Sequence, residues 1–171
     1  MTTAPEPSVE SYLPTIQSLL SQIIQHGGFS LKFTIRQGES AGRGPEDVEM
    51  VVEFDGADAD LLLEKNGALL DALEYVVLKA TGAEESVFRK FTFDCKDWRR
   101  IRAEELRLTA RMAAQQVVES GSPFSLSPMN PRERRIVHLA LRDESAVRTM
   151  SEGAGALRKV VVLPASGSSS R

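Results

Sequence analysis

One stretch decides the architecture of the second half of this chain: Asn130-Pro131-Arg132-Glu133-Arg134-Arg135-Ile136-Val137-His138-Leu139-Ala140-Leu141-Arg142. It predicts a helix with a marked start. Asn130 suits the capping position, Pro131 the first helical position, and Glu133 the reciprocal place in a capping box. The aliphatic residues between Ile136 and Leu141 spread over a broad arc of such a helix, so most of its surface is expected to be buried.

The remaining face of this helix is polar and mostly basic. Arg134, His138 and Arg142 follow one another at i, i+4 and i+8 and so form one stripe, with Arg135 beside it. A ridge of guanidinium, imidazole and guanidinium groups on a mostly buried helix predicts an anion-binding surface. The alternative is a structural pair, in which His138 caps a carbonyl group or packs under a sheet.

The spacing Arg134-x-x-x-His138 is also that of the R-three-H domain, a module that binds single-stranded nucleic acid. The segment 127–130 precedes the helix, and 147–153 and 158–164 look like the paired strands that close that domain. The ordered run from Pro123 to Pro164 resembles the Jag (SpoIIIJ-associated) family of bacterial RNA-binding proteins. The resemblance implies that Arg134 and His138 belong to an RNA site.

The residues before Lys96 predict a separate arrangement of helices and strands. Apolar residues at helical spacing predict a helix over 9–26 that Gly27 and Gly28 end, and alternation predicts strands over 29–36 and 48–54 in an antiparallel hairpin. The loop 38–45 joins these strands, a short helix over 58–63 follows, and 64–67 forms a break. The pattern then predicts a longer helix over 68–80 and a third strand over 87–93. The residues expected to face inward from the longer helix are Leu69, Leu70, Leu73, Val76 and Val77.

This order, α-β-β-α-α-β, resembles the type II KH fold, in which a Gly-x-x-Gly loop between two helices contacts the nucleic-acid backbone. The second glycine of that loop is present as Gly67, whereas Glu64 stands in the place of the first. The resemblance makes Lys65 and Gly67 candidate contacts. The carboxylate of Glu64 adds a side chain and repels phosphate. We therefore expect the KH-like domain to be a supporting element or a docking site for a partner rather than to bind RNA.

A long helix is predicted over 97–120, with Asp97 as its cap and Gly121 as its stop. Its arginines lie on one side and its apolar residues Trp98, Ile101, Leu108, Met112 and Ala113 lie broadly on the other. The arginines are either part of a nucleic-acid surface or a solvated face, since Glu104 is one turn from two of them. These arginines are Arg100, Arg107 and Arg111.

Charge is distributed unevenly along the 171 residues. The net charge is −3, but residues 1–95 hold 7 Lys and Arg against 16 Asp and Glu, a net charge of −9. Residues 96–163 hold 13 Lys and Arg against 8 Asp and Glu, a net charge of +5, and Arg171 adds one more positive charge. An acidic half joined to a basic half predicts polyanion binding by the basic half.

Several classes of protein are disfavoured by the sequence. It has no apolar run of membrane-spanning length and no signal-peptide layout at the N-terminus, so we expect a cytoplasmic protein without membrane insertion. Cys95 is the only cysteine, and His26 and His138 are the only histidines, so no metal site is expected. The sequence shows no nucleophile–base pair, carboxylate dyad or phosphate-binding loop, so we expect neither an enzyme nor a cofactor.

We therefore predict an α+β protein of two small domains. A disordered N-terminus (1–8) precedes a KH-like domain (9–95), an R-three-H domain (96–164) and a disordered tail (165–171). Jag proteins often carry a further N-terminal domain, and because the sequence begins close to its KH-like part we expect no such domain within these 171 residues.

The predicted function is binding of single-stranded RNA through phosphate contacts, with single-stranded DNA as the other candidate ligand. The alternative is a module that docks a protein partner or a second copy of itself through the KH-like domain, with RNA binding incidental. The candidate nucleic-acid contacts are Arg134, His138, Arg135, Arg142, Arg148, Arg158, Lys159, Arg100, Arg107, Arg111, Lys65 and Gly67.

Overall fold

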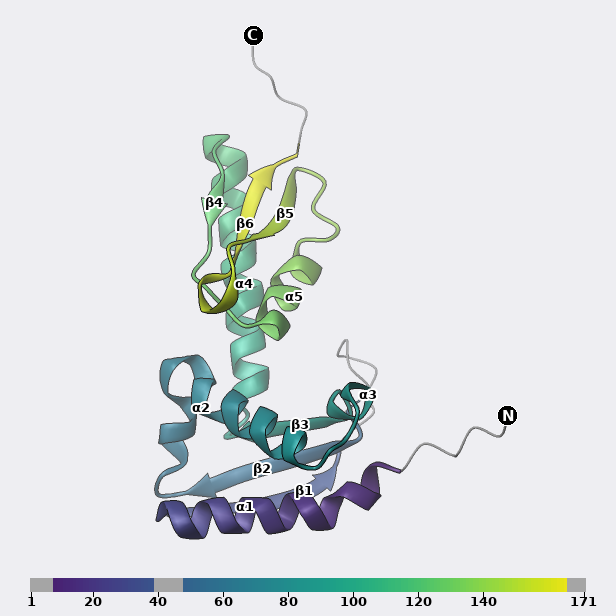
Figure 1. The fold of residues 1–171 in the computed structure, drawn as a ribbon. Helices are drawn as coiled ribbons and strands as arrows, with labels where there is room; N and C mark the ends of the chain where they lie inside the picture. Colours follow the sequence, from purple (N-terminus) through teal and green to yellow (C-terminus); the bar gives the residue numbers. More distant parts are fainter. Residues whose placement is uncertain (1–7, 39–47, 166–171) are drawn as a thin grey trace, which may run out of the picture. The chain divides into compact units, whose positions relative to one another are not determined.

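The computed structural model describes residues 8–38 and 48–165. The predicted disordered ends lie outside the described residues, except for Ser8 and Ala165. Residues 39–45 of the predicted loop also lie outside them. The chain is α+β, as predicted, and forms two compact units, one ending at Arg99 and the other beginning at Arg100 (Figure 1). Within the described ranges, no helix has both the length and the apolar character needed to cross a membrane.

The first unit contains a three-stranded sheet in the order β1-β2-β3. Strand β1 pairs antiparallel with β2, and β2 pairs parallel with β3. The third strand predicted over 87–93 is wrong at its start. Val87 is buried in a short helix and the strand begins at Phe91, because spaced apolar residues suit one helical turn as well as a strand. The elements are η1 (Val9–Tyr12), α1 (Leu13–Gly27), β1 (Leu31–Gln37), β2 (Met50–Gly56), α2 (Ala59–Ala80), α3 (Glu85–Phe88) and β3 (Phe91–Cys95).

Helices α1 and α2 cover one face of this sheet. Alternate residues of β2 and β3 point into a common core, where the rings of Phe54 and Phe93 lie 5.6 Å apart. The helices add Ile16 and Leu20 from α1 and Leu70 and related residues from α2. The fully buried side chains of this core include Ile16, Leu20, Val52, Phe54, Leu70, Val77, Phe91 and Phe93.

Helix α2 is broken where the sequence predicts a break. Glu64 has extended backbone (φ −57°, ψ 151°), and Lys65, Asn66 and Gly67 have φ values of 51°, 61° and 74°. Positive φ is strained for residues that carry a side chain and is readily adopted by glycine. Gly67 also packs closely against Trp98, since a Cβ atom added to Gly67 would lie 2.6 Å from Trp98 Nε1. Packing and backbone conformation therefore both require glycine at this position.

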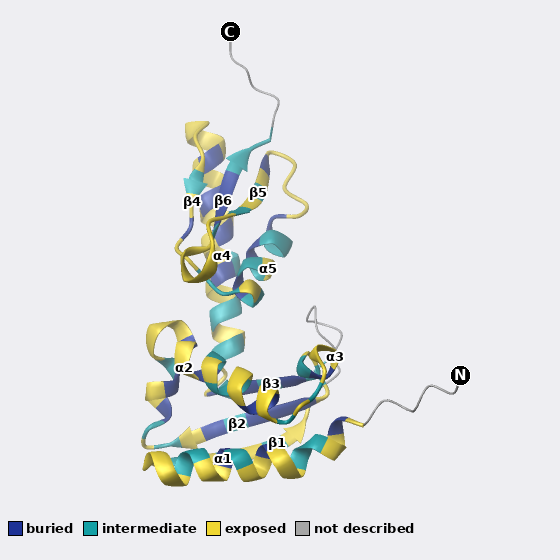
Figure 2. Cartoon of the chain, viewed as in Figure 1, coloured by how far each residue is buried: buried dark blue, intermediate teal, exposed yellow. Residues whose placement is uncertain are grey.

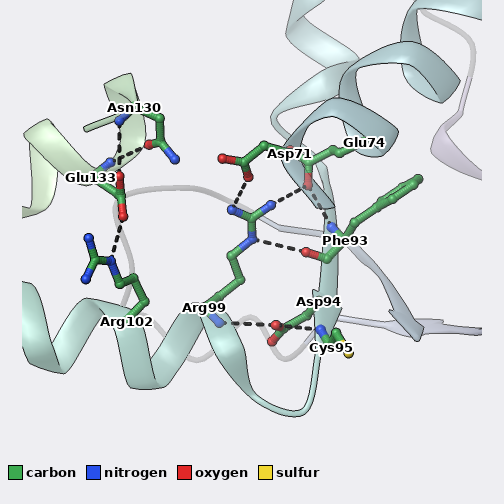
Figure 3. Close-up of polar contacts among 9 residues, drawn as sticks. All are labelled: Asp71, Glu74, Phe93, Asp94, Cys95, Arg99, Arg102, Asn130 and Glu133. Carbon is green, nitrogen blue, oxygen red and sulfur yellow. Dashed lines mark hydrogen bonds and ion pairs between the residues drawn. The ribbon is translucent and has the colours of Figure 1, made fainter. Parts of the chain in front are cut away.

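The guanidinium group of Arg99 joins α2 to β3 (Figure 3). It donates to the carboxylates of Asp71 and Glu74 on α2 and to the carbonyl oxygen of Phe93. Glu74 in turn accepts a hydrogen bond of 2.7 Å from the backbone N–H of Phe93. Because the Arg99 side chain is only 18% exposed, losing one of these carboxylates would leave a partly buried charge without its partner.

The backbone before the long helix departs from the usual geometry of a helix cap. Asp97 has φ 58°, whereas a helix cap has extended backbone. The carboxylate of Asp94 instead accepts from the backbone N–H groups of Cys95 (2.8 Å) and Arg99 (3.1 Å). Burial raises the pKa of Asp94, although these two N–H groups act in the opposite direction.

One face of α2 differs from the prediction. Leu69 and Val76, expected to face inward, are 44% and 55% exposed, while Leu70 and Val77 are buried. Figure 2 shows exposed and buried residues along the length of α2. Leu73, which lies between them on the helix, is partly buried against the core. Leu69 and Val76 therefore form the centre of an apolar stripe on the surface.

The second unit has an antiparallel sheet in the order β4-β6-β5, and α4 and α5 share one core with it. Val160 and Val162 point from the central strand β6 into this core. Helix α4 adds Leu106, Ala110 and Val117, and α5 adds Val137. The elements are α4 (Trp98–Ser120), β4 (Phe124–Ser125), α5 (Pro131–Ala140), β5 (Val147–Glu152), η2 (Gly155–Leu157) and β6 (Lys159–Pro164).

Replacing Gly67 by alanine tests the packing against Trp98. Gly82 is a matched control, because its φ is also positive (72°) but a Cβ atom there would meet nothing within 4 Å. We expect Gly67→Ala to lower the free energy of unfolding by about 1–3 kcal/mol more than Gly82→Ala does, as overpacking requires. Urea unfolding followed by the fluorescence of Trp98, the only tryptophan, measures both. Equal losses of unfolding free energy in the two variants would show that the Trp98 side chain can move aside without cost, and would contradict the assigned packing.

Candidate nucleic-acid interface

The carboxylate of Glu133 and the side chain of Asn130 together hold the start of α5 (Figure 3). Glu133 Oε2 accepts from the backbone N–H of Asn130 (3.1 Å), and the Asn130 side chain accepts from the N–H of Glu133 (2.8 Å). The predicted capping box is thus confirmed. Oε1 also accepts from Arg102 Nε on α4 at 2.7 Å, and Glu133 is only 7% exposed. This contact fixes where α5 begins relative to α4.

Arg134, the first residue of the motif, is anchored at one end. Its Nη1 donates to the carbonyl oxygen of Met129 at 2.9 Å, and the residue is half-buried. A guanidinium group has five N–H donors, so this bond leaves most of them for other acceptors. The neighbouring Arg135 is exposed. One motif arginine is therefore positioned and the next extends into solvent.

His138, the second residue of the motif, does not lie on an exposed ridge as predicted. Its ring lies against β5, with Nδ1 2.7 Å from Thr149 Oγ1 and Nε2 3.0 Å from Ser151 Oγ. The ring is drawn inward because residues 149 and 151 alternate onto the face of β5 that α5 covers. Burial and, secondly, the charge of Arg134 lower the pKa of His138 from its ordinary value of 6.5. The imidazole is thus neutral near pH 7.

Arg142 does not continue the stripe of α5. The helix ends at Ala140, and Leu141 follows with φ −111° and is buried. The chain turns here because the Leu141 side chain enters the core, and Arg142 lies exposed in the turn that follows. The predicted i+8 position therefore belongs to a different element.

The basic residues of β5 and β6 lie on the other face of the sheet. Thr149 and Ser151 point toward α5, so the alternating residue Arg148 points away from it. Lys159 pairs with Glu152 and shares that outer face. Arg158 is exposed, and its backbone carbonyl accepts from the N–H of Met129. The structure thus separates Arg148 and Lys159 from Arg134 and His138, whereas Arg158 shares the contact residue Met129 with Arg134.

The arginines of α4 differ in their surroundings. Arg107 pairs with Glu104 at 2.6 Å, as the solvated-face alternative envisaged, and Arg100 and Arg111 are exposed. Three of the five apolar residues that the sequence placed together are exposed, while Ala113 is buried and Trp98 is half-buried, because the buried side of α4 is formed by Leu106, Ala110, Ala113 and Val117. The exposed apolar residues are Ile101, Leu108 and Met112.

In the first unit, Lys65 is exposed in the break of α2, while Gly67 is buried against Trp98. Packing and a positive φ account for the glycine at this position without a nucleic-acid contact. The sequence reasoning did not identify Arg102, Thr149 or Ser151. The i, i+2 spacing of the two hydroxyl residues on a predicted strand was a signal that they share a face, but not that they meet His138.

The comparisons with known proteins agree with this geometry. The model of the R-three-H domain matches residues 104–164, which include α5 and its motif. This part of the chain is an R-three-H domain, and the resemblance seen in the sequence is confirmed for it.

The chain is also similar to bacterial proteins named RNA-binding protein KhpB, of the Jag family. The one from Clostridium symbiosum is 36% identical over 114 residues, which are 67% of this chain and 51% of the relative. The one from Bacillus subtilis is 32% identical over 109 residues (63% and 52%), and the one from Lactiplantibacillus plantarum is 31% identical over 111 residues (65% and 34%). The chain thus spans between a third and about half of these relatives, and the predicted Jag resemblance is confirmed. The KH-like assignment of the first unit and the predicted domain boundaries stay predictions.

Replacing Glu133 by alanine tests the anchor of α5. We expect a loss of about 2–4 kcal/mol in the free energy of unfolding, because the backbone N–H of Asn130 loses its acceptor and the half-buried Arg102 loses its nearest partner. Glu105→Ala is the matched control, since Glu105 contacts the same guanidinium at 3.2 Å but is 54% exposed. That variant should change stability by no more than about 0.5 kcal/mol. Urea unfolding followed by circular dichroism compares the two, and similar losses would contradict the assigned role.

The titration of His138 tests its burial against β5. We expect an NMR titration midpoint below about 6.5 in the folded chain, and a shift upward in Arg134→Ala. Folding lowers the pKa of His138. The stability that neutral His138 contributes is therefore present above about pH 6.5 and is lost as the pH falls through the pKa of His138 in the folded chain. The stability difference between wild type and His138→Gln should therefore shrink on acidification. A midpoint above 6.5 would contradict this environment.

Proposed function

We propose that this chain binds single-stranded RNA through phosphate contacts made by its second unit. The R-three-H domain at 104–164 supports this, as do the relatives, whose names describe them as RNA-binding proteins. The charge of +5 over residues 96–163, against −9 over residues 1–95, supports the same half as the binding half.

The observation that carries the proposal is that the matched R-three-H domain places Arg134 and His138 on one short helix with a fixed start. Arg134 is held by Met129 and keeps several N–H donors for a phosphate. Arg135 adds a second cation on the same helix, and Arg142 follows in the next turn. We place Arg148 and Lys159 in a secondary role, because they occupy the opposite face of the sheet.

Binding of this kind needs positioned cations and no covalent chemistry. We therefore infer a cytoplasmic nucleic-acid-binding protein rather than an enzyme. In this proposal the first unit is a KH-like domain that serves as a supporting element or as a docking site for a partner. The exposed Glu64, in the position of the first loop glycine, disfavours a close approach of phosphate to the break in α2.

A second candidate function has one observation in its favour. The stripe around Leu69 and Val76 on α2 exposes apolar side chains that the sequence pattern would place in a core. Such a stripe suits docking of a protein partner or of a second copy of the chain. Sedimentation of the wild type and of Leu69→Asp tests whether the stripe docks a second copy of the chain. A docking surface predicts that the wild type forms a dimer and that the aspartate variant does not.

Substitution of Arg134 tests the proposed RNA site. We expect Arg134→Ala to weaken binding of labelled oligouridine by about tenfold or more, since it removes charge-assisted hydrogen bonds. It should also reduce the slope of log affinity against log salt by about 0.7, the value for one phosphate contact on a single strand. The affinity of Arg134→Lys should lie between those of the wild type and of Arg134→Ala, because lysine keeps the charge and loses the paired donors.

The matched control is Arg89→Ala, which removes an exposed arginine outside the proposed site. It should leave affinity and salt slope unchanged. Fluorescence anisotropy at several salt concentrations measures both, and circular dichroism checks that each variant is folded. Equal effects of the two substitutions would mean that only net charge matters and that Arg134 has no particular role.

A further inference from the structure

Both ring nitrogens of His138 are already engaged within the fold. Thr149 Oγ1 and Ser151 Oγ lie 2.7 and 3.0 Å from Nδ1 and Nε2. The two residues are i and i+2 on β5, so their side chains share a face and their separation matches the span of an imidazole. A ligand could reach a ring nitrogen only by breaking one of these bonds.

The two hydroxyl groups keep hydrogen-bonding capacity of their own. A neutral imidazole has one N–H donor and one bare acceptor nitrogen. One hydroxyl must therefore donate its proton to the ring, which leaves that oxygen free only to accept. The other hydroxyl accepts from the ring N–H, which leaves its own proton free to donate. The ring thus leaves one hydroxyl with a remaining acceptor beside one with a remaining donor.

The surroundings of the ring maintain this neutral form. Arg134 on α5 is the charged group whose positive charge acts on His138, and it disfavours protonation. On β5 the charged residues Arg148 and Glu152 alternate to the outer face. On β6 the residues paired with Thr149 and Ser151 are the buried Val162 and Val160. Thr149 and Ser151 are themselves only half-buried, so the pair lies at the edge of the unit.

An adjacent donor and acceptor match the ribose–phosphate backbone of RNA. A phosphate oxygen can only accept, whereas a ribose 2′-hydroxyl can donate, and DNA lacks that second group. Resting on the RNA-binding function proposed above, we propose that Thr149 and Ser151 determine specificity: held by His138, they donate to a phosphate and accept from a 2′-hydroxyl, and so favour RNA over DNA. His138 is then a positioning residue that acts through these hydroxyls.

The test compares binding of labelled oligouridine and oligodeoxyuridine, which differ only in the 2′-hydroxyl, to the full chain near pH 7.5. We expect the wild type to prefer the RNA by about three- to tenfold, the value of one hydrogen bond. The double variant Thr149→Val with Ser151→Ala should bind both probes with equal, weakened affinity and an unchanged salt slope, because no charge is lost. The conservative exchange Thr149→Ser with Ser151→Thr should retain the preference.

Ser125→Ala is the matched control, because Ser125 lies on the other edge strand of the same sheet and is exposed. It should change neither affinity nor preference. Circular dichroism and thermal unfolding check that the double variant folds, and if it does not, Thr149→Val and Ser151→Ala are compared singly. Each single variant should then lower the preference for RNA.

Two results would overturn the inference while the RNA-binding function stands. In one, the wild type binds both probes equally well and Arg134→Ala weakens both. In the other, the hydroxyl variants bind RNA as tightly as the wild type or more tightly, which means that the freed ring nitrogens make the contact themselves. If the wild type binds neither probe, the proposed function itself fails.

Discussion

The carboxylate of Glu133 is the constraint on which the second unit depends. It closes the capping box with Asn130 and accepts from Arg102 at 2.7 Å, so one side chain decides where α5 begins and what it packs against. Arg134 is the next residue, and His138 follows one turn later. Their positions against Met129 and β5 therefore depend on a buried ion pair. Breaking such a pair costs more than forming it contributes, because the remaining charge stays partly buried.

The two motif residues have different tasks in this arrangement. Arg134 is held through one N–H and can offer the others to a phosphate, so it supplies charge and direction. His138 is neutral, and both of its ring nitrogens contact β5 hydroxyls, so it positions those hydroxyls and adds no charge. The motif thus combines a cation with a group that positions β5 hydroxyls. Arg148 and Lys159 on the outer face of the sheet share the sign of charge with Arg134 but not its position.

Local spacing predicted what local contacts determine. The capping box of Asn130 and Glu133 is a three-residue relation and was predicted correctly, as was the break in α2 at Gly67. Errors arose where distant parts of the chain decide the outcome. Asp94, three residues before the predicted cap Asp97, accepts from the backbone N–H of Arg99, and His138 turns inward because β5 supplies two hydroxyls. Helical periodicity likewise placed Leu69 and Val76 on an apolar face, but it does not show that a core exists to cover that face.

Amide chemical-shift mapping tests most directly whether RNA lies along α5 and the facing side of β5. Oligouridine would be added to the isotope-labelled full chain, and the shift of every assigned amide followed to saturation. The largest changes are predicted for Arg134, Arg135 and His138 on α5 and for Thr149 and Ser151 on β5. Changes confined to Lys65–Gly67, or to the outer-face residues Arg148 and Lys159 with α5 unaffected, would contradict the assignment of the RNA site.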